Sequence, residues 1–358
     1  MEKPRRTYRF KRIDTHNRKS IGIIVLVVIL LLVPAVVHSP YYIHLLIMVG
    51  INAALAMTFI FLLRVGLINL SIAAFWGIGA YASAMLTMRL NLPFWLALPA
   101  ATIITGIVAL IVGLLLCRNS GFGFIIPTLA FASVVVLVFG TFDVFGGYVG
   151  IVNIPHPEPI VIPLLPLIEF TSKTPYYYLM LFLVAVVVTA FSAFYSASTG
   201  RAWRAIGLSS SLAESLGINL FRYRLTAFII ASAVCGLMGS FYAHYYSALV
   251  PITFTPFPKT IYCHIFAILG GIAFPFAGPA VGAFILTLTP EFLRIVGEIE
   301  PILTGLLVIV LVLFAPGGIL GLLSSRQQVA HPSESIDRIG KWIKASLPTS
   351  RTDRENRK

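Results

Sequence analysis

The sequence predicts an all-α protein, a polytopic transmembrane helical bundle with about ten membrane segments. Hydrophobic residues make up 58% of the chain and charged residues only 11%, and the mean hydropathy is +0.93. A soluble domain is about 25% charged, so lipid is the expected solvent for most of this chain. Several apolar runs reach the roughly 20 residues that a spanning helix needs, and they lack the ~10-residue alternating pattern of a membrane β-strand.

Basic residues gather outside the apolar runs. Of the 26 Lys and Arg residues, eight lie in 1–20, four in 200–224 and eight in 326–358. Because loops rich in Lys and Arg stay on the cytoplasmic side, all three blocks, and with them both termini, are expected in the cytoplasm. The chain then divides into a basic cytoplasmic N-terminus (1–20), a transmembrane domain (21–323) and a basic cytoplasmic tail (324–358). This distribution accounts for the net charge of +13, and nucleic acid is not an expected partner.

Hydropathy sets the order of the membrane segments. They are expected at 21–38, 42–63, 66–88, 94–117, 122–145, 176–197, 225–249, 259–273, 274–290 and 301–316. The run 66–88 contains Asn69, Ser71 and several glycines. We expect it to be broken or buried inside the bundle, where irregular backbone is tolerated. The run 259–290 is short for two full crossings, so a pair of short helices and a re-entrant element are the alternatives.

Two further segments lie outside these runs. Residues 146–175 contain six prolines and cannot form a regular helix, so they are expected to be the sizeable loop of the outer face. In the tail, apolar residues recur at helical spacing between Ile336 and Leu347. That spacing fits a helix on the inner membrane surface, and a disordered tail is the equal alternative.

The sequence contains no motif for catalysis or ATP hydrolysis. P-loop, HExxH and GxSxG patterns are absent, so no catalytic or metal-binding residue is assigned and the chain is not expected to be an enzyme. A charged residue near the membrane midplane, the usual mark of an ion relay, is not expected either. The charged residues beside the runs map to span ends: Arg64, Arg89, Arg118, Asp143 and Lys259. Energy for uphill transport would therefore come from another chain.

Histidine and cysteine residues in the apolar segments are interpreted as packing residues. An isolated histidine in such a place is more often hydrogen-bonded within the core than a ligand. The cysteines show neither metal spacing nor a disulfide framework, and we expect small core side chains. The residues in or at the end of apolar segments are His244, His264, Cys117, Cys235 and Cys263, and the same interpretation applies to His156 in the loop of the outer face.

A charged segment, GRAWRAIGLSSSLAESLGINLFRYRL, interrupts the apolar chain at residues 200–225. The charge pattern places it in the cytoplasm. Its first part is typical of a short helix, and Ser209, Ser210 and Ser211 offer N-caps for a second helix whose C-cap is Gly217. A topology anchor needs only a few arginines, so a capped helix held parallel to the membrane indicates a further role.

This segment resembles the cytoplasmic coupling loop of ABC importer permeases. The pattern of residues 200–219 is similar to the form GRA..AI…AE.LGIN of the branched-chain amino acid permease family. Other pieces resemble the same family in order: INLSIAAFWGIGAY, IIPTLAF, GGYVGIVNIPHP, LGGIAFPFAGPAVGA and FAPGGILGLL. The resemblance spans residues 45–323. Ser71 stands where the family usually has glycine, which bears on the solute more than on the fold.

The resemblance implies a set of partners. A second homologous permease subunit would complete the pathway, and two ATP-binding subunits would dock beneath it. A periplasmic solute-binding protein would dock on the loop 146–175 and on residues 250–258. ATP and Mg would be bound by the partner ATPase subunits, so no cofactor is expected on this chain. The implied location is the bacterial inner membrane, as a multi-pass protein.

The resemblance also assigns roles to residues. The helix that docks into an ATPase groove is implied to be Ser209, Ser210, Ser211, Leu212, Ala213, Glu214, Ser215, Leu216 and Gly217. The flanking residues that would face lipid headgroups or an acidic ATPase surface are Arg201, Arg204, Arg222 and Arg224. The candidates for lining the translocation path are Asn69, Ser71 and Thr128.

These observations lead to one hypothesis and several alternatives. The hypothesis is an uptake permease for branched-chain amino acids or a related small polar solute, driven by ATP hydrolysed on partner subunits. A permease for urea, an amide or another small solute is the alternative within the family. A stand-alone channel or ion-coupled carrier predicts transport without an ATPase and normally an embedded charge. A membrane scaffold without a transport role is a further class.

Overall fold

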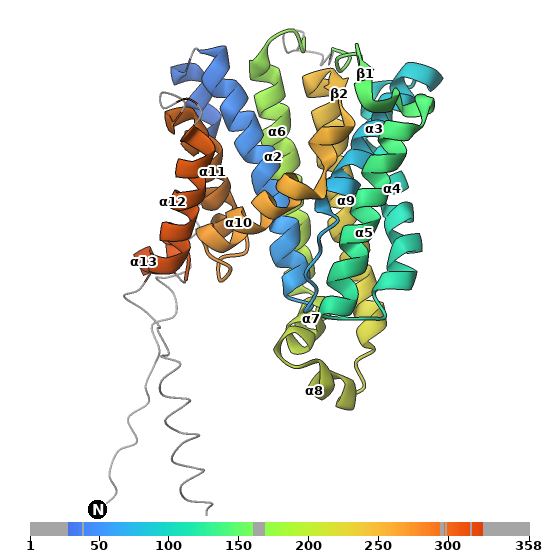
Figure 1. Cartoon of the computed structure of the whole chain (residues 1–358), viewed down its shortest axis with the longest axis vertical. Coiled ribbons are helices and arrows are strands. Elements are labelled where there is room, and N and C mark those ends of the chain that lie inside the picture. The colour runs from blue at the N-terminus through green and yellow to red at the C-terminus, as the bar shows by residue number, and fades with distance from the viewer. Residues whose placement is uncertain are drawn as a thin grey trace, which may run out of the picture.

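The computed structural model describes residues 28–37, 39–159, 169–293, 297, 299–315 and 317–324, and these are mostly helical (Figure 1). The longer helices are α2 (Pro40–Leu63), α3 (Ile72–Leu90), α4 (Phe94–Leu116), α5 (Phe122–Thr141), α6 (Lys173–Ser196), α9 (Leu220–Tyr246), α11 (Ala277–Leu293) and α12 (Glu300–Phe314). The shorter ones are α7 (Ser198–Leu208), α8 (Ser210–Ser215), α10 (Ile261–Gly270) and α13 (Ile319–Ser324). Residues 28–36 are also helical, and β1 (Ile151–Val152) pairs antiparallel with β2 (Ala248–Leu249).

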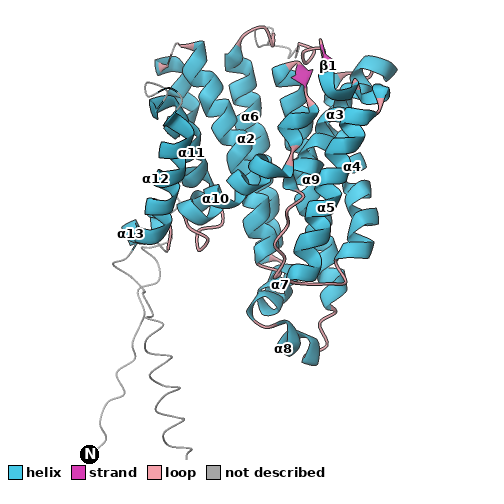
Figure 2. Cartoon of the chain, viewed as in Figure 1, coloured by secondary structure: helices cyan, strands magenta, loops and turns pink. Residues whose placement is uncertain are grey.

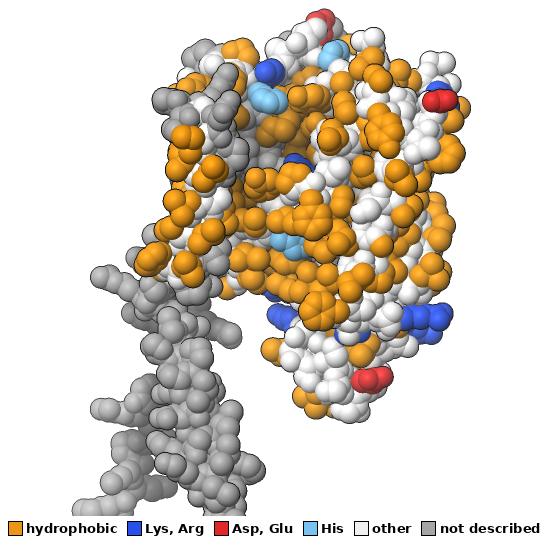
Figure 3. All heavy atoms as spheres, viewed as in Figure 1, with side chains coloured by type: hydrophobic (Ala, Val, Ile, Leu, Met, Phe, Trp, Pro, Cys, Tyr) orange, Lys and Arg blue, Asp and Glu red, His pale blue; other side chains and the backbone are white. Residues whose placement is uncertain are grey.

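Five of these helices are long and apolar enough to cross a membrane: α2, α4, α5, α6 and α9. In their most apolar windows α2 and α9 are 72% and 67% buried, whereas α4, α5 and α6 are 22% to 28% buried. The first two therefore form the centre of the bundle, and the other three present apolar side chains outward, as lipid-facing helices do. Figure 3 shows hydrophobic side chains over the flank where α4 and α5 lie.

The all-α membrane class is confirmed for the described residues. The total of about ten crossings and the cytoplasmic position of both termini stay predictions. Both terminal basic blocks, 1–20 and 326–358, and the proposed surface helix 336–347 lie outside the described residues.

Glycines let α3 and α9 approach until their backbones touch. A Cβ atom added to Gly79 would overlap the backbone of Gly236, and one added to Gly239 would overlap the carbonyl oxygen of Trp76. Small residues at such crossings are the main means by which helices pack tightly in lipid. The crossing holds the interrupted helix α3 against the central helix α9.

We expect Gly239→Ala to destabilise the protein by about 3 kcal/mol, the upper end for overpacking, because the new methyl group meets backbone that cannot rotate away. Gly106→Ala is the matched control, since the atoms nearest its added Cβ lie at 3.9 Å. Thermal unfolding in detergent measures both variants. An equal midpoint for the two would show that the α3–α9 crossing is looser than described.

Two interruptions of the helical structure lie inside the bundle. After α2 ends, residues 64–71 run back into the bundle without helical structure, and α3 begins only at Ile72 (Figure 2). The predicted break in the run 66–88 is therefore confirmed. In the second interruption, Phe257 has extended backbone angles (φ −107°, ψ 121°), and the helix that includes α10 starts after it.

The run 259–290 forms the pair of short helices that was one of the two alternatives. α10 has 10 residues and α11 has 17, and residues 271–276 connect them. Ten residues of helix rise about 15 Å, half of a hydrocarbon layer of roughly 30 Å. A full crossing by 259–273 as one helix is thus wrong, because the kink at Phe257 and the end of α10 at Gly270 limit the helix.

Residues 146–159, from the loop predicted for the outer face, are fastened to the end of the bundle that lies opposite α7 and α8 (Figure 1). The β1–β2 pair joins residues 151–152 to residues 248–249. His244 donates from Nδ1 to the Pro155 carbonyl (2.7 Å), and its Nε2 accepts from the Ser83 hydroxyl (2.9 Å). A Glu158 oxygen accepts from the backbone N–H of Phe94 (3.0 Å), at the start of α4.

The three histidines considered above, His156, His244 and His264, are hydrogen-bonded, as predicted; His244 is buried, His264 is half-buried and His156 is exposed. Besides His244, His156 bonds the hydroxyl of Tyr176 through Nδ1 (2.8 Å), and His264 bonds the carbonyl of Thr260 through Nδ1 (2.6 Å). The three cysteines, Cys117, Cys235 and Cys263, are free and buried.

Candidate functional site

The charged segment at 200–225 forms two short helices that project from one end of the bundle (Figure 1). Ser209 is the N-cap of α8, and its hydroxyl accepts from the backbone N–H of Leu212 (3.3 Å). Gly217 ends the helix with φ +80°, and its N–H bonds the carbonyl of Glu214 (2.9 Å). The predicted N-cap is therefore present; the C-cap is Leu216, and Gly217 is the left-handed residue directly after it.

Helix α7 is anchored firmly to the bundle by Trp203. This side chain is 1% exposed, and its ring lies 4.9 Å from that of Phe61 on α2 and 5.9 Å from that of Phe194 on α6. Its indole N–H donates to the carbonyl of Tyr223 on α9 (3.0 Å). Trp203 thus ties α7 to three long helices at once. An aromatic residue among arginines did not by itself indicate this role.

A glycine brings α7 still closer to α2. A Cβ atom at Gly207 would overlap the carbonyl oxygen of Arg64, just after the end of α2. The guanidinium of Arg64 lies over the ring of Tyr195 at 4.7 Å, at the end of α6. The ends of α2, α6 and α7 therefore form one packed unit.

Helix α8 and its neighbours expose three leucines at the tip of the bundle. Leu208 is 89% exposed, Leu212 is 62% exposed and Leu216 is 72% exposed, while Ala213 faces inward and is buried. A cluster of exposed apolar side chains rimmed by polar residues is typical of a protein interaction site. We call Leu208, Leu212 and Leu216 the leucine tip.

The flanking arginines divide into two groups. Arg201, Arg204 and Arg222 are exposed, in agreement with the predicted position of the flanks. The prediction for Arg224 is wrong, because its side chain is only 5% exposed and donates from Nη2 to the hydroxyl of Ser210 (3.0 Å). Arg224 lies on the inner face of α9, beside a cavity of about 440 Å³, and fixes the start of α8 instead of facing lipid headgroups.

The three predicted path residues lie together at the first interruption. The Asn69 side-chain oxygen accepts from both the N–H (2.9 Å) and the hydroxyl (2.6 Å) of Ser71, and the Thr128 hydroxyl accepts from the backbone N–H of Leu70 (3.3 Å). All three side chains are buried in this chain. They satisfy backbone that the break leaves without helical partners, and their part in a translocation path stays a prediction.

Lys259 lies deep inside the bundle, and its predicted position at a span end is wrong. Its ammonium donates to the side-chain oxygen of Asn52 (2.7 Å), which sits near the midpoint of α2, and it lies 4.6 Å from the ring centre of Trp76. The Asn52 amide in turn donates to the hydroxyl of Thr287 on α11 (3.0 Å). The sequence did not predict a functional position for Lys259. The one available signal was Pro258 directly before it, because proline is a typical first residue of a helix.

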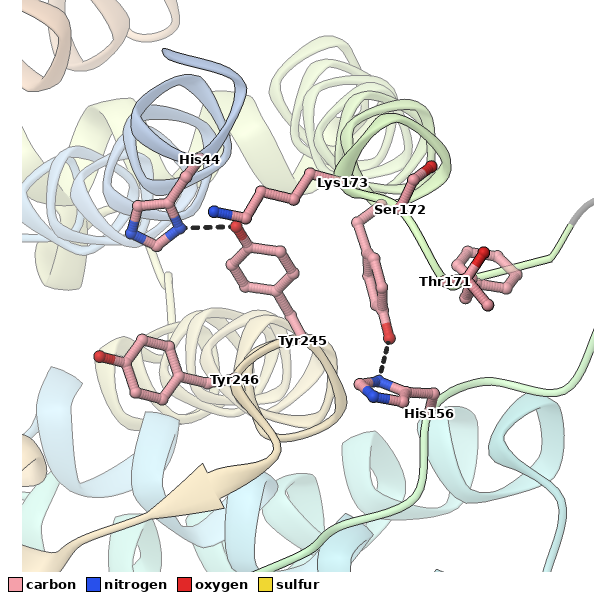
Figure 4. A pocket seen from close by; sticks show the side chains of 9 residues that line it. His44, His156, Thr171, Ser172, Lys173, Tyr245 and Tyr246 are labelled. Atoms are coloured by element: carbon pink, nitrogen blue, oxygen red, sulfur yellow. Dashed lines mark hydrogen bonds between the residues drawn. The ribbon is translucent and has the colours of Figure 1, made fainter. Parts of the chain in front are cut away.

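A second pocket, with a volume of about 280 Å³, opens at the end of the bundle opposite α7 and α8 (Figure 4). His44 of α2 bonds the hydroxyl of Tyr245 on α9 (2.6 Å), and the side chain of Lys173 from the start of α6 points toward this pair. Tyr176 bonds His156 on the opposite wall. These hydrogen bonds connect α2, α6, α9 and the loop residue His156, so the side chains that line the pocket also hold this end of the bundle together.

The chain matches the family model described as branched-chain amino acid transport system / permease component over residues 41–316. Two curated relatives are named high-affinity branched-chain amino acid transport system permease protein LivM, one from Salmonella typhimurium strain LT2 and one from Escherichia coli strain K12. Each is 27% identical to this chain, over 302 and 296 residues respectively, with 78% of this chain and 68% of the relative covered. No solved structure matches the chain significantly.

Proposed function

The chain belongs to the family of permease components of branched-chain amino acid transport systems, and on that premise we propose that it is a membrane subunit of an ABC importer. It would translocate branched-chain amino acids or a related small polar solute across the bacterial inner membrane. ATP would be hydrolysed on two partner subunits, and a second homologous permease subunit would form the other wall of the pathway. A periplasmic solute-binding protein would deliver the solute at the outer end.

The leucine tip is the observation that carries this proposal. Its leucines lie at the end of α7, in α8 and directly after α8, at the end of the bundle opposite the β1–β2 pair, and exposed basic residues flank them. Exposed leucines that would otherwise face water are explained by a partner with an apolar groove. An acidic rim on that groove would complement Arg201, Arg204 and Arg222.

The packing behind the leucine tip supports transmission of motion. Trp203 and Gly207 hold α7 against α2, and Arg224 holds the start of α8 against α9. A rigid-body displacement of a docked ATPase would thereby be passed to the two most buried helices of the bundle. The helices that would contact the ATPase, α7 and α8, are then connected to the polar residues inside the bundle through tightly packed helices.

An ATPase-independent channel or ion-coupled carrier is the second candidate. The embedded Lys259 is a charge of the kind that such carriers contain. This candidate predicts uptake by the chain without ATP-binding subunits, whereas the first predicts none.

Deletion of residues 209–217 tests the proposal. We expect the deletion to abolish co-purification of the ATP-binding subunits with the membrane subunits and to abolish ATP-driven uptake in proteoliposomes. The control replaces the nine residues by a flexible Gly-Ser segment of equal length, which keeps the loop closed and should fail in the same way. Intact ATPase association and uptake after the deletion would refute the coupling role.

A further inference from the structure

We propose that Lys259 receives the carboxylate group of the transported solute at mid-depth in the bundle, and so selects carboxylate-bearing solutes over urea and amides. The inference rests on the proposed transport function and names a group that determines its specificity. It is carried by three features around Lys259: an ammonium without an anionic partner among the described residues, two helix starts that lie beside it, and neutral side chains that hold it in place.

The Lys259 ammonium has polar contacts but no counter-charge among the described residues. Its partners are the Asn52 amide oxygen at 2.7 Å and the face of the Trp76 ring at 4.6 Å, and both are neutral. A cation at this depth is costly, and intramembrane charges are normally paired or placed on a substrate route. The Lys259 residue is half-buried in this chain and is not fully enclosed.

Two helix starts reinforce the positive field around this ammonium. α3 begins at Ile72, after the first interruption, and the helix that includes α10 begins after Phe257, with Lys259 in its first turn. The two starts are in contact, because the backbone N–H of Ala73 donates to the hydroxyl of Thr260 (3.1 Å). The start of a helix carries partial positive charge and favours anions, so both helices add to the field of Lys259.

The surrounding side chains keep the ammonium in one place. Asn52 is itself oriented by its bond to Thr287 on α11 (3.0 Å), and Trp76 packs at 4.8 Å against Phe254. An orienting neutral amide leaves the positive charge available, whereas a carboxylate at the same position would cancel it. The site therefore suits the carboxylate of an amino acid, and it offers urea or an amide no comparable attraction.

The test uses the complete complex of two permease and two ATP-binding subunits in lipid nanodiscs, without the solute-binding protein. The probes are leucine, leucinamide and urea at millimolar concentration, and the readout is the stimulation of ATP hydrolysis. We expect leucine to stimulate the wild-type complex, and leucinamide and urea to have little effect. Lys259→Gln should raise the half-maximal leucine concentration by about tenfold or more, and Lys259→Arg by about threefold or less.

Arg89→Gln is the matched control, since it also removes one positive charge. Arg89 lies near the exposed end of α3 and bonds the carbonyl of Val144 (2.8 Å), away from the interruption. It should leave the leucine response unchanged.

Three results would overturn the proposal. Equal stimulation by urea and leucine in the wild type would show that the site does not select carboxylates. An unchanged leucine response in Lys259→Gln would show that Lys259 does not bind the solute. Loss of the second permease subunit from the Lys259→Gln complex would show that the ammonium pairs with a carboxylate of that subunit instead. A failure of the proposed transport function would be seen in a different experiment. In that case the ATP-binding subunits would still co-purify with the membrane subunits after deletion of residues 209–217.

Discussion

Replacing two leucines of the leucine tip with glutamate, in the variant Leu212→Glu/Leu216→Glu, is expected to separate the ATP-binding subunits from an intact membrane subunit. The two side chains are 62% and 72% exposed in the chain, so their replacement should change its own stability by no more than about 0.5 kcal/mol. An apolar anchor in the centre of an interface contributes about 2–4 kcal/mol, which corresponds to a roughly 30- to 1,000-fold weaker association for each leucine.

Co-purification of the ATP-binding subunits and ATP-driven uptake measure this effect, and thermal unfolding in detergent measures the stability of the chain. Leu212→Met/Leu216→Met is the matched control, because methionine keeps the size and the apolar character of both side chains. It should retain association. If the glutamate variant still bound the ATP-binding subunits as the wild type does, the leucine tip would have to lie on the membrane surface and not in a partner.

Trp203→Ala is expected to produce the opposite combination, with ATPase binding retained and transport per ATP greatly reduced. The substitution leaves the leucine tip unchanged but removes the buried side chain that joins α7 to α2, α6 and α9. Truncation of a buried tryptophan costs about 3–5 kcal/mol, so the thermal midpoint should also fall. The ratio of solute taken up to ATP hydrolysed, measured in proteoliposomes, reports the loss of coupling.

Two further variants distinguish packing from hydrogen bonding at this position. Trp203→Phe keeps most of the ring but cannot donate to the Tyr223 carbonyl, and it should cost about 1 kcal/mol. Trp95→Ala removes a tryptophan that is 36% exposed at the other end of the bundle and should leave the coupling ratio unchanged. A normal coupling ratio in Trp203→Ala would mean that α7 does not transmit the motion.

Features set by local sequence were predictable. The long apolar helices and the ends of α8 at Ser209 and Gly217 depend on residues close to one another in the chain. The break before α3 was also foreseen from Asn69 and Ser71, because polar residues and glycines interrupt an apolar run. Pairing across the chain was not foreseen, as between Leu70 and Thr128, since neither residue type specifies a distant partner.

The depth of a residue was the least predictable quantity. Hydropathy windows treat each run as one continuous helix, so a residue at the start of a run is placed at the membrane surface. Lys259 starts a helix in the interior because the kink at Phe257 carries the chain inward before the helix begins. For Arg224 the error concerned the side of the helix that the residue occupies. Its position in the sequence did not reveal that its side chain faces the bundle and not the headgroups.

The fastening of the outer loop has a consequence for the kinetics of encounter. The β1–β2 pair, the His244 bond to Pro155 and the Glu158 bond to Phe94 hold residues 151–158 in place before any partner arrives. A protein that docks there need not pay the conformational entropy of ordering a loop, and a preformed surface also shortens the search for the correct orientation. Delivery of solute at this end would then be limited by diffusion and charge, and brief, repeated visits by a loaded carrier protein would suffice.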